Sequence, residues 1–198
     1  MDLGNRSLWI FDMDGTLTRS VHDFETIRNT LGLAEGAPIL ESIAAMDDAE
    51  QAAALGEVAA WERSLVARAA AQPGATELLT RLRSRGARLG ILTRNLRSLA
   101  HLTLAEAGLA EYFAPADVLG RDSAAPKPSP EGIQLLLEQW NGLAHEAVMV
   151  GDYVFDAQAG RAAGVATILL DPDHRPEWRG FADLVLDELA DLLEHLNG

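Results

Sequence analysis

The chain has 198 residues, of which 48% are hydrophobic, and it carries a formal net charge of −14 at pH 7. This length fits one domain, or one domain with a small inserted lobe. An acidic surface repels nucleic acid and anionic membranes, so neither is expected as a partner, and no apolar run approaches the roughly 20 residues of a membrane helix. The chain has no cysteine, which excludes disulfides and thiolate sites. Because no basic leader with a long apolar stretch opens the sequence, a cytoplasmic location is expected.

The first predicted element is a strand at residues 8–11. The run Leu-Trp-Ile-Phe is apolar throughout, as in a strand that is buried on both faces of a parallel sheet. From residue 21 to 72 the pattern is helical, with helices predicted at 24–31, 39–46 and 48–71, the last one capped by Asp47-Asp48. We therefore expect a small all-helical cap at residues 19–72, inserted after the first strand.

After Pro73-Gly74 the pattern alternates between helix and strand. The predicted helices are 75–85, 96–107, 130–140, 155–163 and 188–196, and the predicted strands are 88–93, 117–119, 147–150, 165–170 and an edge strand at 183–186. Such alternation implies parallel βα units with right-handed crossovers. The expected fold class is α/β, a Rossmann-like doubly wound parallel sheet, with residues 1–18 and 73–198 forming the catalytic core.

Polar residues with related chemistry follow four of the predicted strands. They are Asp12 and Asp14, then Thr93-Arg94-Asn95, then Lys127, and finally Asp152 with Asp156 four residues later. In a doubly wound sheet, ligands bind at the carboxyl ends of the strands. We therefore expect these side chains to converge on one crevice.

The types of these residues suit phosphoryl transfer. Four aspartates in one crevice need a counter-charge, and a hard, oxygen-bound cation such as Mg²⁺ supplies it and also accepts phosphate oxygens. Lys127, the single lysine of the chain, adds a second positive charge from a loop stiffened by flanking prolines. Thr93 offers a hydroxyl before a helix N-terminus, where anions are favoured. Without cysteine, a carboxylate is the plausible covalent nucleophile, and a second carboxylate would serve as general acid and base.

At this point the sequence resembles a known family. The run Phe-Asp-Met-Asp-Gly-Thr-Leu at 11–17 is similar to the first motif of the haloacid dehalogenase superfamily. Thr93, Lys127 and the run from Gly151 to Asp156 resemble the second, third and fourth motifs, in the same order. The resemblance covers the whole chain and points to a phosphoglycolate phosphatase-like branch with a short helical cap of the C1 type.

The resemblance implies a role for each matching residue. Asp12 would be the nucleophile and a metal ligand, and Asp14 the general acid and base, with its main-chain carbonyl on the metal. Thr93 and the main-chain N–H of Arg94 would hold the phosphate, and Lys127 would stabilise the transferring group. Asp152 would bind Mg²⁺, whereas Asp156 would either bind it, directly or through water, or orient Lys127.

The implied function is a magnesium-dependent phosphomonoesterase that acts on a small phosphorylated metabolite through an aspartyl phosphate. A dehalogenase is disfavoured by Asp14, and a phosphonate hydrolase by the lack of a cap lysine. A phosphoglucomutase-like phosphosugar mutase and a catalytically silent binding protein remain alternatives. No obligate protein partner is implied.

Several points stay open in the sequence. Arg19 and His22 are candidate substrate contacts, and a role as surface hinge residues between cap and core is the alternative. Arg63 and Arg68 are expected to be solvated or paired with nearby glutamates on an alanine-rich helix. The natural substrate, the oligomeric state and the role of Asn95 cannot be read from the residues.

Overall fold

A computed structural model of the protein describes residues 3–178 and 180–196. The outermost residues of the expected core, 1 and 198, lie outside the described ranges. The sheet has six parallel strands in the order β3-β2-β1-β4-β5-β6. Their bounds are β1 Leu8–Phe11, β2 Arg88–Leu92, β3 Val118–Leu119, β4 Ala147–Gly151, β5 Ala166–Leu170 and β6 Leu184–Leu186. The expected doubly wound parallel sheet is confirmed, with β6 at one edge as predicted.

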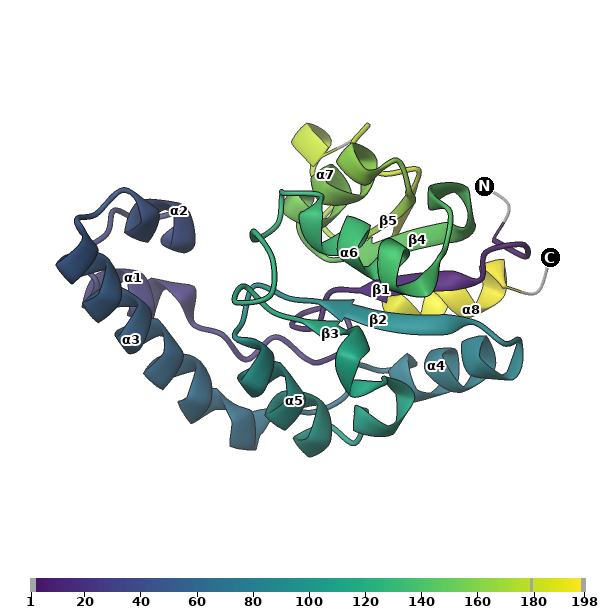
Figure 1. Ribbon diagram of the computed structural model, residues 1–198, viewed down its shortest axis with the longest axis horizontal. Helices are drawn as coiled ribbons and strands as arrows, with labels where there is room; N and C mark the ends of the chain where they lie inside the picture. The colour runs from purple at the N-terminus through teal and green to yellow at the C-terminus, as the bar shows by residue number, and fades with distance from the viewer. Residues whose placement is uncertain (1–2, 179, 197–198) are drawn as a thin grey trace.

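The helices of the core cover both faces of this sheet (Figure 1). Their bounds are α4 Ala75–Ser84, α5 Arg97–Glu106, α6 Glu131–Trp140, α7 Val154–Ala163 and α8 Leu192–His195, the last preceded by a 3₁₀ turn at Leu189–Asp191. Apolar residues of α4, α5 and α8 share one buried cluster with the sheet, and those of α6 and α7 share another. Successive residues of β1 alternate between the clusters, with Trp9 and Phe11 in the first and Leu8 and Ile10 in the second. The alternation follows from the two-residue period of a strand.

Three helices between β1 and α4 form a separate group beside the sheet (Figure 1). They are α1 Phe24–Thr30, α2 Ile39–Ala44 and α3 Asp48–Leu65. A small apolar cluster of their own, made of Ile27, Ile43, Ala54 and Val58, holds them together. We call residues 19–72 the cap segment.

The predicted helix at 48–71 is too long, because α3 ends at Leu65 and a 3₁₀ turn follows at Val66–Arg68. The residues after this turn pair with the chain that enters the cap segment. The N–H of Arg19 donates to the carbonyl of Ala70 at 2.9 Å, and the N–H of Gln72 donates to the carbonyl of Leu17 at 2.8 Å. The two linkers therefore form a short antiparallel connection between sheet and cap segment, which an alanine-rich sequence does not reveal.

Two ion pairs join the cap segment to loops of the core. Arg94 donates to both carboxylate oxygens of Glu41, at 2.9 and 2.8 Å. Arg121 pairs with Glu62 of α3 at 2.7 Å, and both side chains are almost fully buried, at 7% and 6% exposed. These contacts hold the cap segment over the carboxyl ends of the strands. Within the described residues, no helix has the length and apolar character that crossing a membrane requires.

Candidate active site

The loop after β1 places the first two aspartates. The N–H of Asp12 donates to the carbonyl of Val150 at 2.8 Å, which continues the pairing of β1 with β4 and fixes the position of Asp12. Gly15 then turns the chain with φ +89°, a left-handed conformation that suits glycine. The N–H of Gly15 donates to the carbonyl of Thr18 at 2.8 Å and closes the turn. Asp14 therefore points back toward the crevice.

Lys127 lies at the centre of the site and is only 2% exposed. Its Nζ lies 2.5 Å from Asp12 Oδ1 and 2.7 Å from Asp156 Oδ1. Burial alone would favour the neutral amine, but the charges of Asp12 and Asp156 raise the pKa of Lys127 above its usual value. The lysine is therefore held protonated between two carboxylates.

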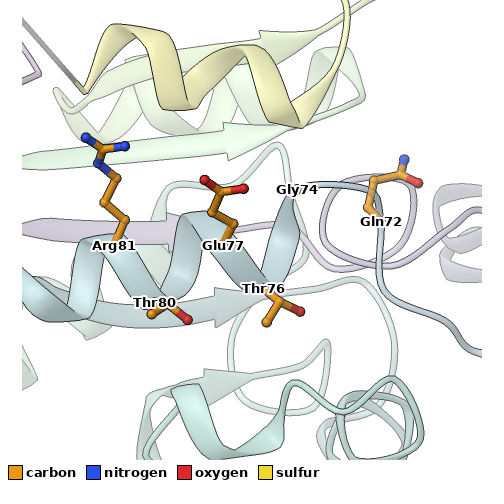
Figure 2. A pocket seen from close by; sticks show the side chains of 6 residues that line it. All are labelled: Gln72, Gly74, Thr76, Glu77, Thr80 and Arg81. Atoms are coloured by element: carbon orange, nitrogen blue, oxygen red, sulfur yellow. The ribbon is translucent and has the colours of Figure 1, made fainter.

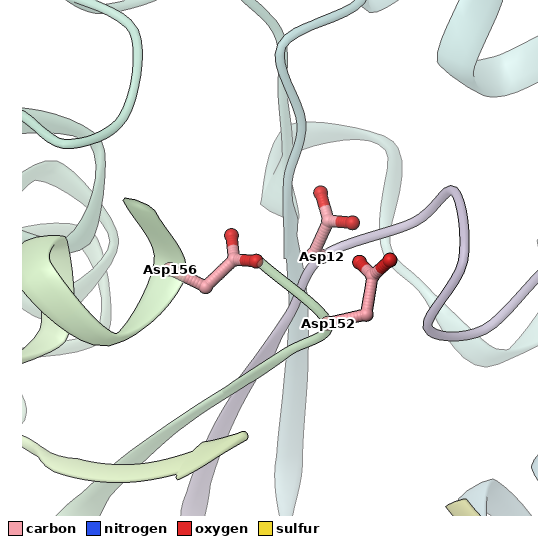
Figure 3. A group of neighbouring side chains, drawn as sticks. All are labelled: Asp12, Asp152 and Asp156. Atoms are coloured by element: carbon pink, nitrogen blue, oxygen red, sulfur yellow. The ribbon is translucent and has the colours of Figure 1, made fainter. Parts of the chain in front are cut away.

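Three carboxylates lie close together in Figure 3: Asp12 after β1, Asp152 after β4 and Asp156 in the first turn of α7. Each offers an oxygen that lies within 4.8 Å of the others. Burial raises the pKa of Asp152 well above its usual range, and the charges of Asp12 and Asp156 add to the effect. Burial also raises the pKa of Asp156 to about 6, against the opposing effect of Lys127. The single positive charge of Lys127 therefore does not balance the negative charges of these three carboxylates.

A divalent cation fits this cluster. Carboxylate oxygens are the ligands that Mg²⁺ prefers. A cation among them would favour the charged form of Asp152, against the burial and the neighbouring charges that raise its pKa. The hydroxyl of Thr16 donates to Asp152 Oδ1 at 3.2 Å and orients that carboxylate. The residues present are therefore suited to hold Mg²⁺.

Asp14 occupies a different environment from Asp12. Its Oδ1 accepts a hydrogen bond from the Thr18 hydroxyl at 3.2 Å, and its Oδ2 accepts one from the Asn95 amide at 2.7 Å. Burial raises the pKa of Asp14 to about 6, although the hydrogen bonds from Thr18 and Asn95 oppose the shift. A carboxyl group with this pKa exchanges protons near neutral pH, as a general acid and base must.

Thr93 and Arg94 follow directly after β2, beside these carboxylates. Thr93 is buried, and its hydroxyl accepts a hydrogen bond from the N–H of Asn95 at 3.2 Å. The side chain of Arg94 donates to the carbonyl of Lys127 at 2.6 Å and lies 4.9 Å from the centre of the Phe155 ring. Together with the ion pair to Glu41, these contacts give the Arg94 guanidinium a structural role.

The candidate residues of the cap segment fall into two groups. His22 reaches the site, with its Nδ1 3.9 Å from Asp14 Oδ1, and burial lowers its pKa to about 4, helped by the charge of Arg68. Arg19 instead lines a neighbouring void of only 10 Å³. Arg63 and Arg68 are exposed, as expected for solvated helix residues. The structure therefore brings His22, but not Arg19, into the crevice.

Sequence reasoning missed two residues that shape this site and left the role of a third open. Asn95 was left open and proves to hold Asp14. Glu62 and Arg121, which lie 59 positions apart, were not singled out. Their pairing depends on how the cap segment docks, and neither residue belongs to a local pattern.

The core and the cap segment enclose a cavity of 420 Å³ above the strand ends. Its lining includes eight predicted site residues, namely Asp12, Asp14, His22, Thr93, Arg94, Lys127, Asp152 and Asp156. A larger surface hollow of 610 Å³ lies along α4, lined by the residues drawn in Figure 2, among them Thr76, Glu77 and Thr80. None of its lining residues belongs to the predicted site, so the chemistry lies in the smaller, more enclosed cavity.

Gly15 gives a test of the loop geometry. A Cβ added at Gly15 would lie 2.1 Å from Asp152 Oδ2, and the φ of +89° would strain any other residue. We expect Gly15→Ala to lower the free energy of unfolding by about 2–5 kcal/mol, measured by urea denaturation. The control is Gly86→Ala, which has φ +79° but nothing within 4 Å of the added carbon, and it should cost only about 1–2 kcal/mol. Equal losses for the two variants would contradict the close approach to Asp152.

The fold and the site define a class of protein: a doubly wound α/β enzyme with an aspartate- and lysine-based centre at the strand ends, covered by a helical insertion. The family description of haloacid dehalogenase-like hydrolases matches residues 8–164. The chain therefore belongs to the haloacid dehalogenase-like hydrolases, and the predicted superfamily is confirmed.

Individual relatives agree with this assignment. A haloacid dehalogenase-like hydrolase domain-containing protein of Arabidopsis thaliana is 32% identical over an alignment of 178 positions that covers 84% of this chain and 71% of the relative. A protein named phosphoglycolate phosphatase from Rhodospirillum rubrum is 31% identical over an alignment of 189 positions that covers 81% of this chain and 78% of the relative. The crystal structure of a hydrolase from Pseudomonas syringae superposes with a TM-score of 0.82 at 22% identity, covering 97% of this chain and 98% of the other. This last likeness concerns the fold.

Proposed function

We propose that the protein is a magnesium-dependent phosphomonoesterase that works through an aspartyl phosphate on Asp12. The observation that carries the proposal is the contrast between two neighbouring carboxylates. Asp12 lies 2.5 Å from the Lys127 ammonium, whereas Asp14 is held by Thr18 and Asn95 and has a pKa raised to about 6. Different environments for two carboxylates mark different roles, here a nucleophile and a proton donor. The relative named phosphoglycolate phosphatase supports phosphatase chemistry.

In this proposal, Asp12, Asp152 and the main-chain carbonyl of Asp14 would hold Mg²⁺. Asp156 would act chiefly on Lys127, to which it lies 2.7 Å away, and would also face the metal. When bound, Mg²⁺ would offset the charge of the carboxylates and polarise a phosphate oxygen. The cytoplasmic location and the division into a core and a cap at residues 19–72 stay predictions.

The reaction proceeds in two steps. A carboxylate oxygen of Asp12 attacks phosphorus and the bond from phosphorus to the ester oxygen breaks. Protonated Asp14 gives its proton to that oxygen, which leaves as the alcohol, and Asp14 becomes a carboxylate. The Asp14 carboxylate then takes a proton from a water molecule, whose oxygen attacks phosphorus. The bond to Asp12 breaks, and inorganic phosphate leaves. Lys127 balances the developing negative charge, while Thr93 and the main-chain N–H of Arg94 hold the phosphate oxygens.

A phosphosugar mutase is the second candidate, but no observation favours it. Such an enzyme must hold a second phosphate, whereas Arg94 is committed to Glu41 and to the Lys127 carbonyl. The direct test of the proposal is phosphate release from a panel of phosphomonoesters by the full chain, with Mg²⁺ and with a chelator. Hydrolysis that depends on Mg²⁺ is expected, and no release from any ester would overturn the proposal.

Asp14→Asn tests the role of the proton donor. Steady-state turnover should fall by about 10²–10⁴-fold, because both steps need Asp14. With 4-nitrophenyl phosphate, whose leaving group needs no proton, the variant should still release a burst of about one equivalent of nitrophenol and then stall. Undiminished steady-state turnover would contradict the role of Asp14.

The pKa of Asp14 also predicts how the reaction rate depends on pH. Proton donation needs the neutral acid, which predominates below the pKa of about 6. The single-turnover rate on an alkyl phosphate should therefore decline as the pH rises above about 6. In Asn95→Ala the decline should begin at higher pH, since the lost hydrogen bond had stabilised the charged carboxylate. An unmoved profile would mean that Asn95 does not tune Asp14.

A further inference from the structure

The cavity above the strand ends has two unlike halves. The core half carries the carboxylates and Lys127. The half contributed by the cap segment is mainly apolar, with side chains of Phe24, Pro38, Ile39, Leu40, Val58 and Trp61 in its lining. Tyr153 and Phe155 add aromatic side chains from the core. A phosphate on Asp12 would therefore lie in the polar half, and the rest of the substrate would face apolar groups.

Three rings of the cap segment form a joined surface in this cavity. The ring centre of His22 lies 5.4 Å from that of Phe24 and 5.2 Å from that of Trp61, and Phe24 and Trp61 are 5.7 Å apart. Phe24 stays 46% exposed, so much of its ring remains free to contact a ligand. Exposed rings at such distances can pack against a ring of a ligand.

The charged groups around this apolar half are already paired. Arg28 pairs with Glu25 and donates to the carbonyl of Ala37 at 2.8 Å. Arg94 is bound to Glu41, and Glu62 is bound to Arg121. Among the described residues, the charged groups of the lining outside the aspartate and lysine centre therefore each have a partner of opposite charge.

This pairing bears on which substrates fit. A second anion on the substrate, whether carboxylate or phosphate, would have to break one of these ion pairs or remain unpaired in a partly desolvated cavity. Breaking the buried pair of Arg121 with Glu62 would be costly, and so would an unpaired anion in the cavity. The pair of Arg28 with Glu25, whose glutamate is 51% exposed, opposes a second anion only weakly. The chain's net charge of −14 adds to the repulsion.

We infer that the substrate is a phosphomonoester of an uncharged, ring-bearing alcohol, whose ring packs on Phe24 and Trp61. This inference rests on the proposed phosphatase function and narrows it. It excludes, as the preferred substrate, small esters with a distal carboxylate such as phosphoglycolate, although a relative carries that name. The cavity of 420 Å³ is within the usual range of about 300–1,000 Å³ for sites that bind small molecules.

The test compares alkyl phosphates with similar leaving groups, so that intrinsic reactivity does not decide the result. We expect kcat/KM with Mg²⁺ for 2-phenylethyl phosphate to exceed that for ethyl phosphate and for 2-phosphoglycolate by about 10- to 100-fold. Phe24→Ala and Trp61→Ala should each lower the ratio of phenylethyl to ethyl phosphate by about tenfold or more. Leu55→Ala, on the same helix as Trp61 but outside the cavity lining, should keep the wild-type ratio.

The outcomes separate the two proposals. If no ester releases phosphate, the proposed function fails, and the inference fails with it. If phosphate is released but phosphoglycolate is preferred, or the ring gives no advantage, the inference is overturned while the phosphatase stands. Because Trp61 also packs against the cap cluster, Phe24→Ala is the decisive variant, and an unchanged ratio in it would overturn the ring contact.

Discussion

Replacing Asp12 with asparagine is expected to lower turnover of 4-nitrophenyl phosphate with Mg²⁺ by at least about 10⁴-fold. The amide of asparagine keeps the shape of the carboxylate but cannot form an acyl phosphate by displacing an alcohol. Lys127 would keep its 2.7 Å contact with Asp156, so the rest of the site has a reason to stay in place. Steady-state kinetics, together with trapping of phosphorylated protein after acid quench, measures the effect.

The matched control is Asp48→Asn in the first turn of α3, an exposed position outside the cavity lining. This variant should keep the wild-type rate and should still yield trapped phosphoprotein. Circular dichroism of Asp12→Asn should show the wild-type helix content. A folded Asp12→Asn protein that retained more than about a tenth of the activity would rule out Asp12 as the nucleophile.

The strands show how much of the fold the residues predict. β1 is found at the predicted residues 8–11, because an apolar run that is buried on both faces is a strong local signal. The end of α3 was not predictable in the same way. Residues 69–71 have good helix propensity, yet they leave the helix to pair with residues 18 and 19 of the incoming linker. This pairing depends on contacts about 50 positions apart along the sequence, and no local pattern carries it.

The candidate site, like the fold, was predictable from the sequence only in part. Convergence of Asp12, Lys127 and Asp152 was predictable, since the carboxyl ends of neighbouring parallel strands meet at one edge of the sheet. The hydrogen bond from Asn95 to Asp14 was not, because it depends on the angle of the turn after β2. The apolar half of the cavity also depends on docking of the cap segment, which is fixed by the pairs Arg94–Glu41 and Arg121–Glu62.

The second large expected effect is that Mg²⁺ stabilises the folded protein in a pH-dependent way. In the metal-free protein, burial and neighbouring charges raise the pKa of Asp152 well above its usual range and those of Asp14 and Asp156 to about 6. Each folded-state pKa is above the unfolded value of 3.8, so the folded protein binds more protons between these values. The stability contributed by these groups is therefore present below about pH 4. For Asp14 and Asp156 it is lost as the pH rises through about 6, and for Asp152 as the pH rises through its own raised pKa.

Mg²⁺ should restore this stability and do so more at pH 7.5 than at pH 5, because at pH 5 protons compete for the same carboxylates. At a concentration of about 100 times Kd, the gain is about 2.7 kcal/mol, which a thermal melt detects. Asp152→Asn should raise the Tm of the metal-free protein, abolish most of the Mg²⁺-dependent gain and reduce turnover by at least about 10²-fold. Asp173→Asn, at an exposed position after β5, is the control and should retain the Mg²⁺-dependent gain. If Asp152→Asn kept the full gain with Mg²⁺, the metal would have to be held elsewhere, and the cluster of Asp12, Asp152 and Asp156 would not be its site.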